Sequence, residues 1–278
     1  MGRFLFIFNE KNSGSYELAG RLSDYLENRG MQVLHPNGQN AFRICDLGRY
    51  QPSAGDIAVV LGGDGTMLAA ARILARHLVP MFGVNMGRVG FLTAVESGGA
   101  VQALDWVLNG EYHIQERLLL SASVVRDGAE MARCIALNEI YVASGNQSRS
   151  VMLDLFIDGE SIHSYHADGI IVATPTGSTG YSLSAGGPIV MEEMDVTLVT
   201  PVCPHTFFSR PILASADSKV EIINRSDLRA ASLTADGQYR FTLEQDDHIF
   251  ITRAPYRVRL IRFSADSYFE RIRNKLYV

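Results

Sequence analysis

A glycine-rich turn with a single carboxylate follows an apolar run near residue 60. Residues 61–66 read LGGDGT and stand between the apolar run DIAVV and the segment MLAAARILARH. Glycines at the end of a strand let the backbone take positive φ and let a ligand approach the main chain, because no Cβ intervenes. With Thr66 as the cap of the following helix, the helix N-terminus favours an anion such as a phosphate. Asp64 is then the carboxylate beside that phosphate.

Two interpretations of this turn stay open on the motif alone. Either the turn binds a phosphate and Asp64 takes part in chemistry, or the glycines form only a tight strand-to-helix connection that Asp64 supports by hydrogen bonds. No Gly-Lys-Ser or Gly-Lys-Thr follows the turn. The segment is therefore not a P-loop, and no lysine of that kind holds the phosphate.

A second segment combines many hydroxyl side chains with glycines and one aromatic ring. Residues 166–190 read HADGIIVATPTGSTGYSLSAGGPIV, so that the hydroxyls come directly after the apolar run GIIVA. The hydroxyl residues are Thr174, Thr176, Ser178, Thr179, Ser182 and Ser184. Together with Tyr181 they suit the hydroxyls and phosphates of a nucleotide and a stacked base. A solvated loop is the alternative, and we favour the binding site.

Asn138 and Glu139 interrupt a third apolar run, ALNEIYVA. Consecutive residues of a strand point to opposite faces, so at least one of the two side chains faces the core or a ligand. A hydrogen-bonded structural asparagine is the alternative interpretation. The histidines, among them His163, His166 and His205, form no pair with metal-ligand spacing. We therefore expect no metal held by protein side chains alone.

The elements that position these segments change in character along the chain. Apolar runs at residues 3–8, 56–61 and 80–84 alternate with helical patterns, which predicts βαβ units and a largely parallel sheet. Sites on such sheets lie at the carboxyl ends of the strands. From Tyr112 on, β-type runs with Asp-Gly turns predict hairpins of a β-sandwich or layered sheet. The run RVRLIRF is among them.

These patterns predict an α/β N-terminal domain over residues 1–110 and a β-rich, sandwich-like domain over residues 111–264. Residues 265–278 form a predicted C-terminal helix that packs back on the N-terminal domain and belongs with it. Gly110, behind the helical segment GGAVQALDWVLNG, marks the change.

Bulk composition excludes some functions. A net charge of −5 over 278 residues argues against nucleic acid and acidic membranes as partners, since both need a clustered positive face. The apolar opening run is too short to span a membrane. The three cysteines, Cys45, Cys134 and Cys203, have no metal-ligand spacing, so we interpret them as reduced core residues of a cytoplasmic protein.

The ordered motifs resemble those of the NAD kinases. The matching segments are GGDGTMLAAAR, GVNMGRVGFL, LNEI, ADGIIVATPTGSTGYSLSAGGPIV, PHTFFSRPIL, DGQ and SYFERIRNKL. The resemblance implies transfer of the terminal phosphate of ATP, bound with Mg²⁺, to the 2'-hydroxyl of the adenosine ribose of NAD. It also implies a homodimer or homotetramer in which neighbouring subunits complete the sites.

The resemblance assigns roles residue by residue. Asp64 is the implied general base for the ribose hydroxyl. The other implied site residues are Gly62, Gly63 and Gly65 around the phosphates, Phe91 lining the NAD pocket, Asn138 and Glu139 on the dinucleotide, Thr179 and Tyr181 on the adenosine part, Asp168 at the nicotinamide end, and Thr176, Gly180 and Ser184 elsewhere in the substrate site. Gly180 stands where many bacterial members have alanine.

Two other functions compete with this one. Lipid and sugar kinases share the Gly-Gly-Asp-Gly turn, but no segment between Tyr112 and Ser150 suggests a pocket for a lipid or a sugar. A dinucleotide-binding regulator without catalysis would not need the Asp64 carboxylate merely to bind phosphates.

Overall fold

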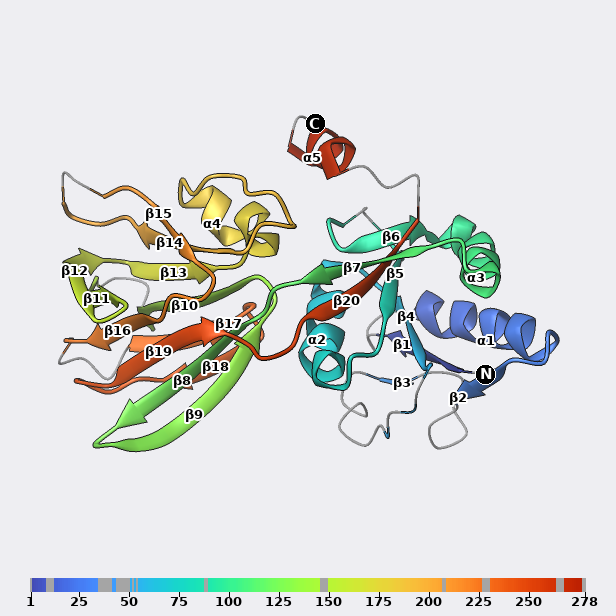
Figure 1. The fold of residues 1–278 in the computed structure, drawn as a ribbon, viewed down its shortest axis with the longest axis horizontal. Coiled ribbons are helices and arrows are strands. Elements are labelled where there is room, and N and C mark those ends of the chain that lie inside the picture. Colours follow the sequence, from blue (N-terminus) through green and yellow to red (C-terminus); the bar gives the residue numbers. More distant parts are fainter. Residues whose placement is uncertain are drawn as a thin grey trace. The chain divides into compact units, whose positions relative to one another are not determined.

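The chain divides into two compact units (Figure 1). The computed structural model describes residues 2–8, 13–34, 42–43, 51, 53, 55–87, 90–145, 150–206, 209–226, 231–263 and 268–276. The first unit combines Met1–Glu116 with Val258–Val278, and the second comprises Arg117–Arg257. The domain limits at residues 110 and 264 stay a prediction. Cys45 and parts of the segments GVNMGRVGFL, PHTFFSRPIL and SYFERIRNKL lie outside the described residues.

The first unit is built on a sheet with the strand order β2-β1-β4-β5-β20-β7, in which β3 also pairs with β1 and β6 with β5. Pairs β1/β2, β1/β4, β4/β5, β5/β6 and β20/β5 are parallel, which confirms the predicted sheet. The strands are β1 (Arg3–Phe8), β2 (Gln32–Leu34), β3 (Phe42–Arg43), β4 (Ile57–Leu61), β5 (Met81–Asn85), β6 (Thr93–Glu96), β7 (His113–Arg117) and β20 (Val258–Arg262).

Helices accompany this sheet as the apolar spacing predicts. They are α1 (Ser13–Glu27), α2 (Asp64–Leu74), α3 (Ala100–Asn109) and α5 (Tyr268–Leu276), with 3-10 turns η3 (Ala75–His77) and η4 (Ser97–Gly99). Leu18, Leu22 and Leu26 of α1 recur every four residues and are buried in one core with β1 and β4. Helix α3 ends at Gly110, whose φ of 75° allows its N–H to reach the carbonyls of the last turn.

The second unit is a sandwich of two six-stranded sheets, ordered β15-β14-β13-β10-β17-β18 and β12-β11-β16-β19-β8-β9. Buried residues of both sheets form one hydrophobic cluster, which confirms the predicted β-rich architecture. The strands are β8 (Leu120–Arg126), β9 (Ala129–Ala136), β10 (Glu139–Ser144), β11 (Val151–Ile157), β12 (Glu160–Ala167), β13 (Gly169–Ala173), β14 (Val196–Val202), β15 (Ile212–Ser215), β16 (Val220–Asn224), β17 (Ala231–Ala235), β18 (Tyr239–Thr242) and β19 (His248–Arg253).

Four expectations from the sequence need correction. The run RVRLIRF forms β20, which pairs with β5 in the first unit and not with the sandwich. Thr66 does not cap α2, because the helix begins at Asp64 and its N-cap residue is Gly63. Cys203 is exposed and is not a core residue, whereas Cys134 is half-buried and packs against the hydrophobic cluster of the sandwich.

The fourth correction concerns the reason for the glycines after β4. None of the three glycines of the turn is among the described glycines with positive φ. Positive φ therefore does not explain the glycines of this turn. The space that a missing Cβ leaves is the remaining explanation.

Two further expectations concern the C-terminus and membranes. Helix α5 forms over the predicted segment, with Tyr268 and Ile272 mostly buried. That it packs back on the first unit stays a prediction. Within the part of the chain that the structure describes, no helix has the length and apolar character needed to cross a membrane.

Candidate active site

In the first unit, the Asp64 carboxylate lies at the first turn of α2, where β4 ends. Its Oδ2 accepts the N–H of Phe91 at 2.8 Å, and its Oδ1 accepts the N–H of Leu92 at 2.9 Å. A Cβ at Gly90 would lie only 1.8 Å from Oδ1, so the close approach of backbone and carboxylate requires glycine there. The fold thus brings Asp64 and Phe91, two predicted site residues, into direct contact.

The glycines of the turn differ in what surrounds them. A Cβ at Gly62 would lie 2.3 Å from the hydroxyl oxygen of Thr66, so Gly62 is needed for packing. A Cβ at Gly63 would meet nothing within 4 Å among the residues that the structure describes, and Gly65 is exposed. The turn is therefore closed on the Gly62 side and open at Gly63, where a phosphate has room to approach the main chain.

In the second unit, a buried carboxylate organises the segment that carries Asn138 and Glu139. Asp236 is 7% exposed and accepts three consecutive N–H groups, from Leu137 at 3.1 Å, Asn138 at 2.8 Å and Glu139 at 3.3 Å. The motif DGQ contains Asp236, but the dipeptide was interpreted only as a hairpin turn. The sequence pattern does not reveal that Asp236 holds the backbone of the Asn138–Glu139 segment.

The Glu139 side chain is in an unusual electrostatic environment. Burial first, and then the negative charge of Asp236, raise its pKa from 4.5 to about 7, against a lowering by the backbone N–H of Tyr181. Its Oε2 is buried and has no hydrogen-bond partner among the described residues. A Cβ at Gly180 would lie 3.1 Å from this oxygen. Glu139 is therefore placed beside Gly180 and Tyr181, two further predicted site residues.

Most hydroxyls of the 166–190 segment are used within the protein. Four of them are engaged in hydrogen bonds that hold the segment in place. These bonds join Thr174 to the Leu137 carbonyl at 2.6 Å, Ser178 to the Pro175 carbonyl at 2.7 Å, Ser182 to the Thr200 hydroxyl at 2.9 Å, and Thr179 to the Thr176 carbonyl at 3.2 Å. Thr174, Ser178 and Ser182 thus use their hydroxyls to hold the segment, and that the segment contacts a nucleotide stays a prediction.

The remaining polar groups of the segment lie on two short helical turns, η5 (Thr176–Thr179) and α4 (Tyr181–Ser184). Tyr181 is 44% exposed, and Ser184 is exposed as well. Thr176 is 7% exposed. Tyr181 and Ser184 are thus the exposed side chains on these two turns.

Asp168 lies between β12 and β13, next to two groups whose pKa it raises. The Tyr181 ring stands edge-on to Tyr141 with ring centroids 5.2 Å apart, and burial, then Tyr181 and Asp168, raise the pKa of Tyr141. The Cys203 thiol donates a hydrogen bond to Asp168, and this bond raises the pKa of Cys203. The second unit thus brings Asp168 near Tyr141 and Cys203.

Possible metal ligands form no cluster among the described residues of either unit. The rings of His166 and His205 have centroids 4.6 Å apart. No group of three or more His, Cys, Asp and Glu side chains suited to a metal occurs among the described residues.

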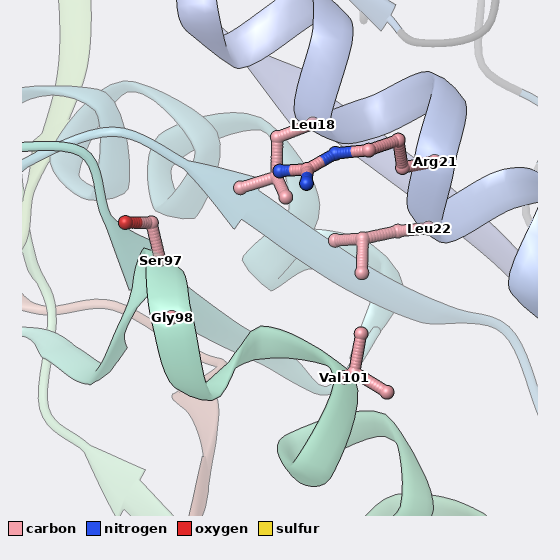
Figure 2. Close-up of a pocket in the computed structure, with 6 residues that line it drawn as sticks. All are labelled: Leu18, Arg21, Leu22, Ser97, Gly98 and Val101. Carbon is pink, nitrogen blue, oxygen red and sulfur yellow. The ribbon is translucent and has the colours of Figure 1, made fainter.

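A cavity in the first unit lies away from these residues. Figure 2 shows its lining residues on α1, η4 and the start of α3. Its volume is about 300 Å³. Its lining is Leu18, Arg21, Leu22, Ser97, Gly98 and Val101. It contains no carboxylate and none of the predicted site residues. We therefore place the candidate active site at Asp64 and at the Asn138–Glu139 segment, each within its own unit.

Comparisons with known proteins show the family of the chain. The family models of the ATP-NAD kinase N-terminal domain and C-terminal domain match residues 4–112 and 137–263. The NAD kinase of Symbiobacterium thermophilum is 41% identical over 99% of this chain and 99% of its own. The NAD kinase of Thiobacillus denitrificans is 39% identical over 96% and 93%.

Solved structures show the same fold. An NAD kinase from Archaeoglobus fulgidus in complex with ATP has a TM-score of 0.77 and 28% identity over 99% of this chain and 98% of its own. Yeast NADH kinase complexed with NADH has a TM-score of 0.87 at 24% identity, over 100% and 87%. With both family models matched and identities near 40% over almost the full length, this chain belongs to the NAD kinase family.

Proposed function

We propose that this chain transfers the terminal phosphate of ATP to the 2'-hydroxyl of the adenosine ribose of NAD, with Asp64 as the general base. Family membership supports the reaction. The observation that carries the assignment of the base is the pair of backbone N–H bonds to Asp64, which fixes its carboxylate beside the open side of the glycine turn.

The geometry orients Asp64 for a role as a base. Its two carboxylate oxygens are hydrogen-bond acceptors, and the bond from one backbone N–H to each of them fixes the plane of the carboxylate. Phosphoryl transfer depends mainly on positioning and on charge stabilisation, with a base that accepts the proton of the attacking hydroxyl. A fixed carboxylate at the end of β4 meets this requirement.

The second unit supplies the proposed dinucleotide site. Asn138 and Glu139 hold the dinucleotide on the segment that Asp236 fixes, and Asp168 serves the nicotinamide end. The other proposed contacts are Thr176, Thr179, Gly180, Tyr181 and Ser184, with Phe91 lining the NAD pocket and Gly62, Gly63 and Gly65 at the phosphates.

Mg²⁺ enters this reaction with ATP. It offsets the charge of the phosphates, while the glycine turn supplies backbone donors. We further propose a homodimer or homotetramer in the cytoplasm, in which a neighbouring subunit completes each site.

The decisive experiment measures NADP formation from NAD, ATP and Mg²⁺ by the native chain and by Asp64→Asn. Loss of the base should lower kcat by about 100-fold or more. Asp24→Asn, at an exposed position of α1, is the matched control and should retain the native kcat. Asparagine accepts only one of the two backbone N–H bonds, so Tm is measured in parallel.

The outcomes separate the competing functions. Native kcat in Asp64→Asn refutes the general base, and a lower Tm with unchanged kcat identifies Asp64 as a structural support of the turn. Phosphorylation of a lipid or sugar but not of NAD would favour another kinase of the Gly-Gly-Asp-Gly group. Stabilisation by NAD without turnover of the native chain would indicate a regulator.

A further inference from the structure

A buried arginine donates hydrogen bonds to the turn that contacts Asp64. Arg262 lies on β20 and is 2% exposed. Its Nη1 donates to the carbonyls of Leu92 at 3.1 Å and Thr93 at 3.4 Å, and its Nη2 donates to that of Phe91 at 3.4 Å. Its Nε donates to the side chain of Gln115 at 3.2 Å. One guanidinium therefore spans three consecutive carbonyls.

The same turn is held from its other side by Asp64. The carbonyl of Phe91 and the N–H of Leu92 belong to one planar trans peptide, in which the two groups point in opposite directions. Arg262 holds the carbonyl end of this peptide, and Asp64 accepts from its N–H end. Fixing the carbonyl therefore fixes the direction in which the N–H points at the carboxylate.

Simple stabilisation does not explain why a charge is buried here. Burying a guanidinium costs free energy that its hydrogen bonds must offset, and an apolar side chain of similar volume often serves stability as well. The planar guanidinium of arginine provides several N–H donors in a fixed geometry, which a lysine ammonium does not reproduce. At position 262 this geometry is suited to orienting the backbone of residues 91–93.

We infer that Arg262 is a positioning residue for the phosphoryl transfer. It touches no substrate. Through the peptide between Phe91 and Leu92 it aims the N–H of Leu92 at Asp64, beside the N–H of Phe91 from the preceding peptide. These two N–H groups keep the carboxylate in the orientation that accepts the proton of the ribose hydroxyl. This inference rests on the proposed role of Asp64.

The first test is Arg262→Lys, which keeps the positive charge but loses the planar arrangement of guanidinium N–H donors. We expect kcat for NADP formation to fall about 10-fold, with a smaller change in the KM for ATP, because the altered group acts on the base and not on ATP. Arg117→Lys is the matched control: Arg117 is likewise fully buried but pairs with Glu192 in the second unit, so its kcat should fall less. In an Asp64→Asn background, Arg262→Lys should cause no further loss of kcat.

The second test uses Arg262→Ala with added guanidinium ion, which replaces the missing N–H donors. Partial recovery of kcat at millimolar guanidinium supports the inference, whereas addition to Arg117→Ala should restore nothing. If Arg262→Ala does not fold, Arg262→Lys alone decides the matter. Additive losses of kcat in Arg262→Lys and Asp64→Asn, or a lower Tm with native kcat, would overturn the inference.

Hydrogen exchange separates this inference from the proposed function. In Arg262→Lys the amides of Phe91 and Leu92 should exchange faster than in the native chain, whether or not Asp64 is the base. Unchanged exchange at both amides refutes the positioning role. Faster exchange together with native activity of Asp64→Asn would refute the general base while leaving the effect of Arg262 on the turn in place.

Discussion

The buried carboxyl of Glu139 makes the stability of the β-rich unit depend on pH. Burial, and then the charge of Asp236, raise the pKa of Glu139 from 4.5 to about 7. At a pH between these two values, Glu139 is protonated in the folded chain and ionised in the unfolded chain. Stability is therefore fully present below about pH 4.5 and is lost as pH rises through about 7.

The structure sets the size of this effect. The interval from 4.5 to about 7, at about 1.4 kcal/mol per pH unit, corresponds to an upper limit of about 3 to 4 kcal/mol. Glu139→Gln removes the titration and keeps an oxygen that accepts the Tyr181 N–H. At pH 8 the variant should therefore be more stable than the native chain by about 1–3 kcal/mol. At pH 4.5, where the native carboxyl is protonated, the two should differ little.

The assay is urea unfolding of both proteins at half-unit steps from pH 4.5 to 8, followed by the fluorescence or circular dichroism of the β-rich unit. Glu160→Gln, at an exposed position of β12, is the control and should follow the native profile. A difference between Glu139→Gln and the native chain that stays constant with pH would show that the reasoning about the raised pKa is wrong. The variant should also have a higher KM for NAD if Glu139 holds the dinucleotide.

Two further predictions follow from close contacts. Gly90→Ala places a Cβ 1.8 Å from a carboxylate oxygen of the proposed base, so kcat should fall at least 10-fold, whereas Gly87→Ala, with no atom within 4 Å, should keep native kcat. Because its bond to Asp168 raises the pKa of Cys203, iodoacetamide should label this thiol more slowly at pH 8 than in Asp168→Asn; equal labelling rates in the two proteins would contradict the bond.

The fold was predictable where local sequence determines it. Alternating apolar runs and helical spacing predicted the parallel strands β1, β4 and β5, because a strand buried on both faces must be apolar throughout. The same reasoning placed β20 in the wrong sheet. Its local pattern suits either sheet, and only its pairing with β5, far away in sequence, decides between them.

The candidate site was also predictable only where the local sequence determines it. Asp64 is recognisable because its neighbours are glycines in a motif. Its partners, the N–H groups of Phe91 and Leu92, are backbone atoms, and backbone donors leave no trace in side-chain identity. Arg262 is one of many arginines in the chain until the fold sets it against the 91–93 carbonyls.

The three Asp-Gly turns show where this limit lies. Asp127, Asp158 and Asp236 each have positive φ, between 50° and 53°, and each is followed by a glycine with positive φ, as the dipeptide predicts for a tight hairpin. Their carboxylates nevertheless differ. Asp127 is exposed, Asp158 accepts the backbone N–H of Lys219 at 2.8 Å, and Asp236 is buried and accepts three N–H groups from residues 137–139. The dipeptide determines the backbone of the turn, whereas the segment that faces the turn determines what the carboxylate binds. Of the three turns, the one at Asp236 faces the segment with the proposed dinucleotide contacts.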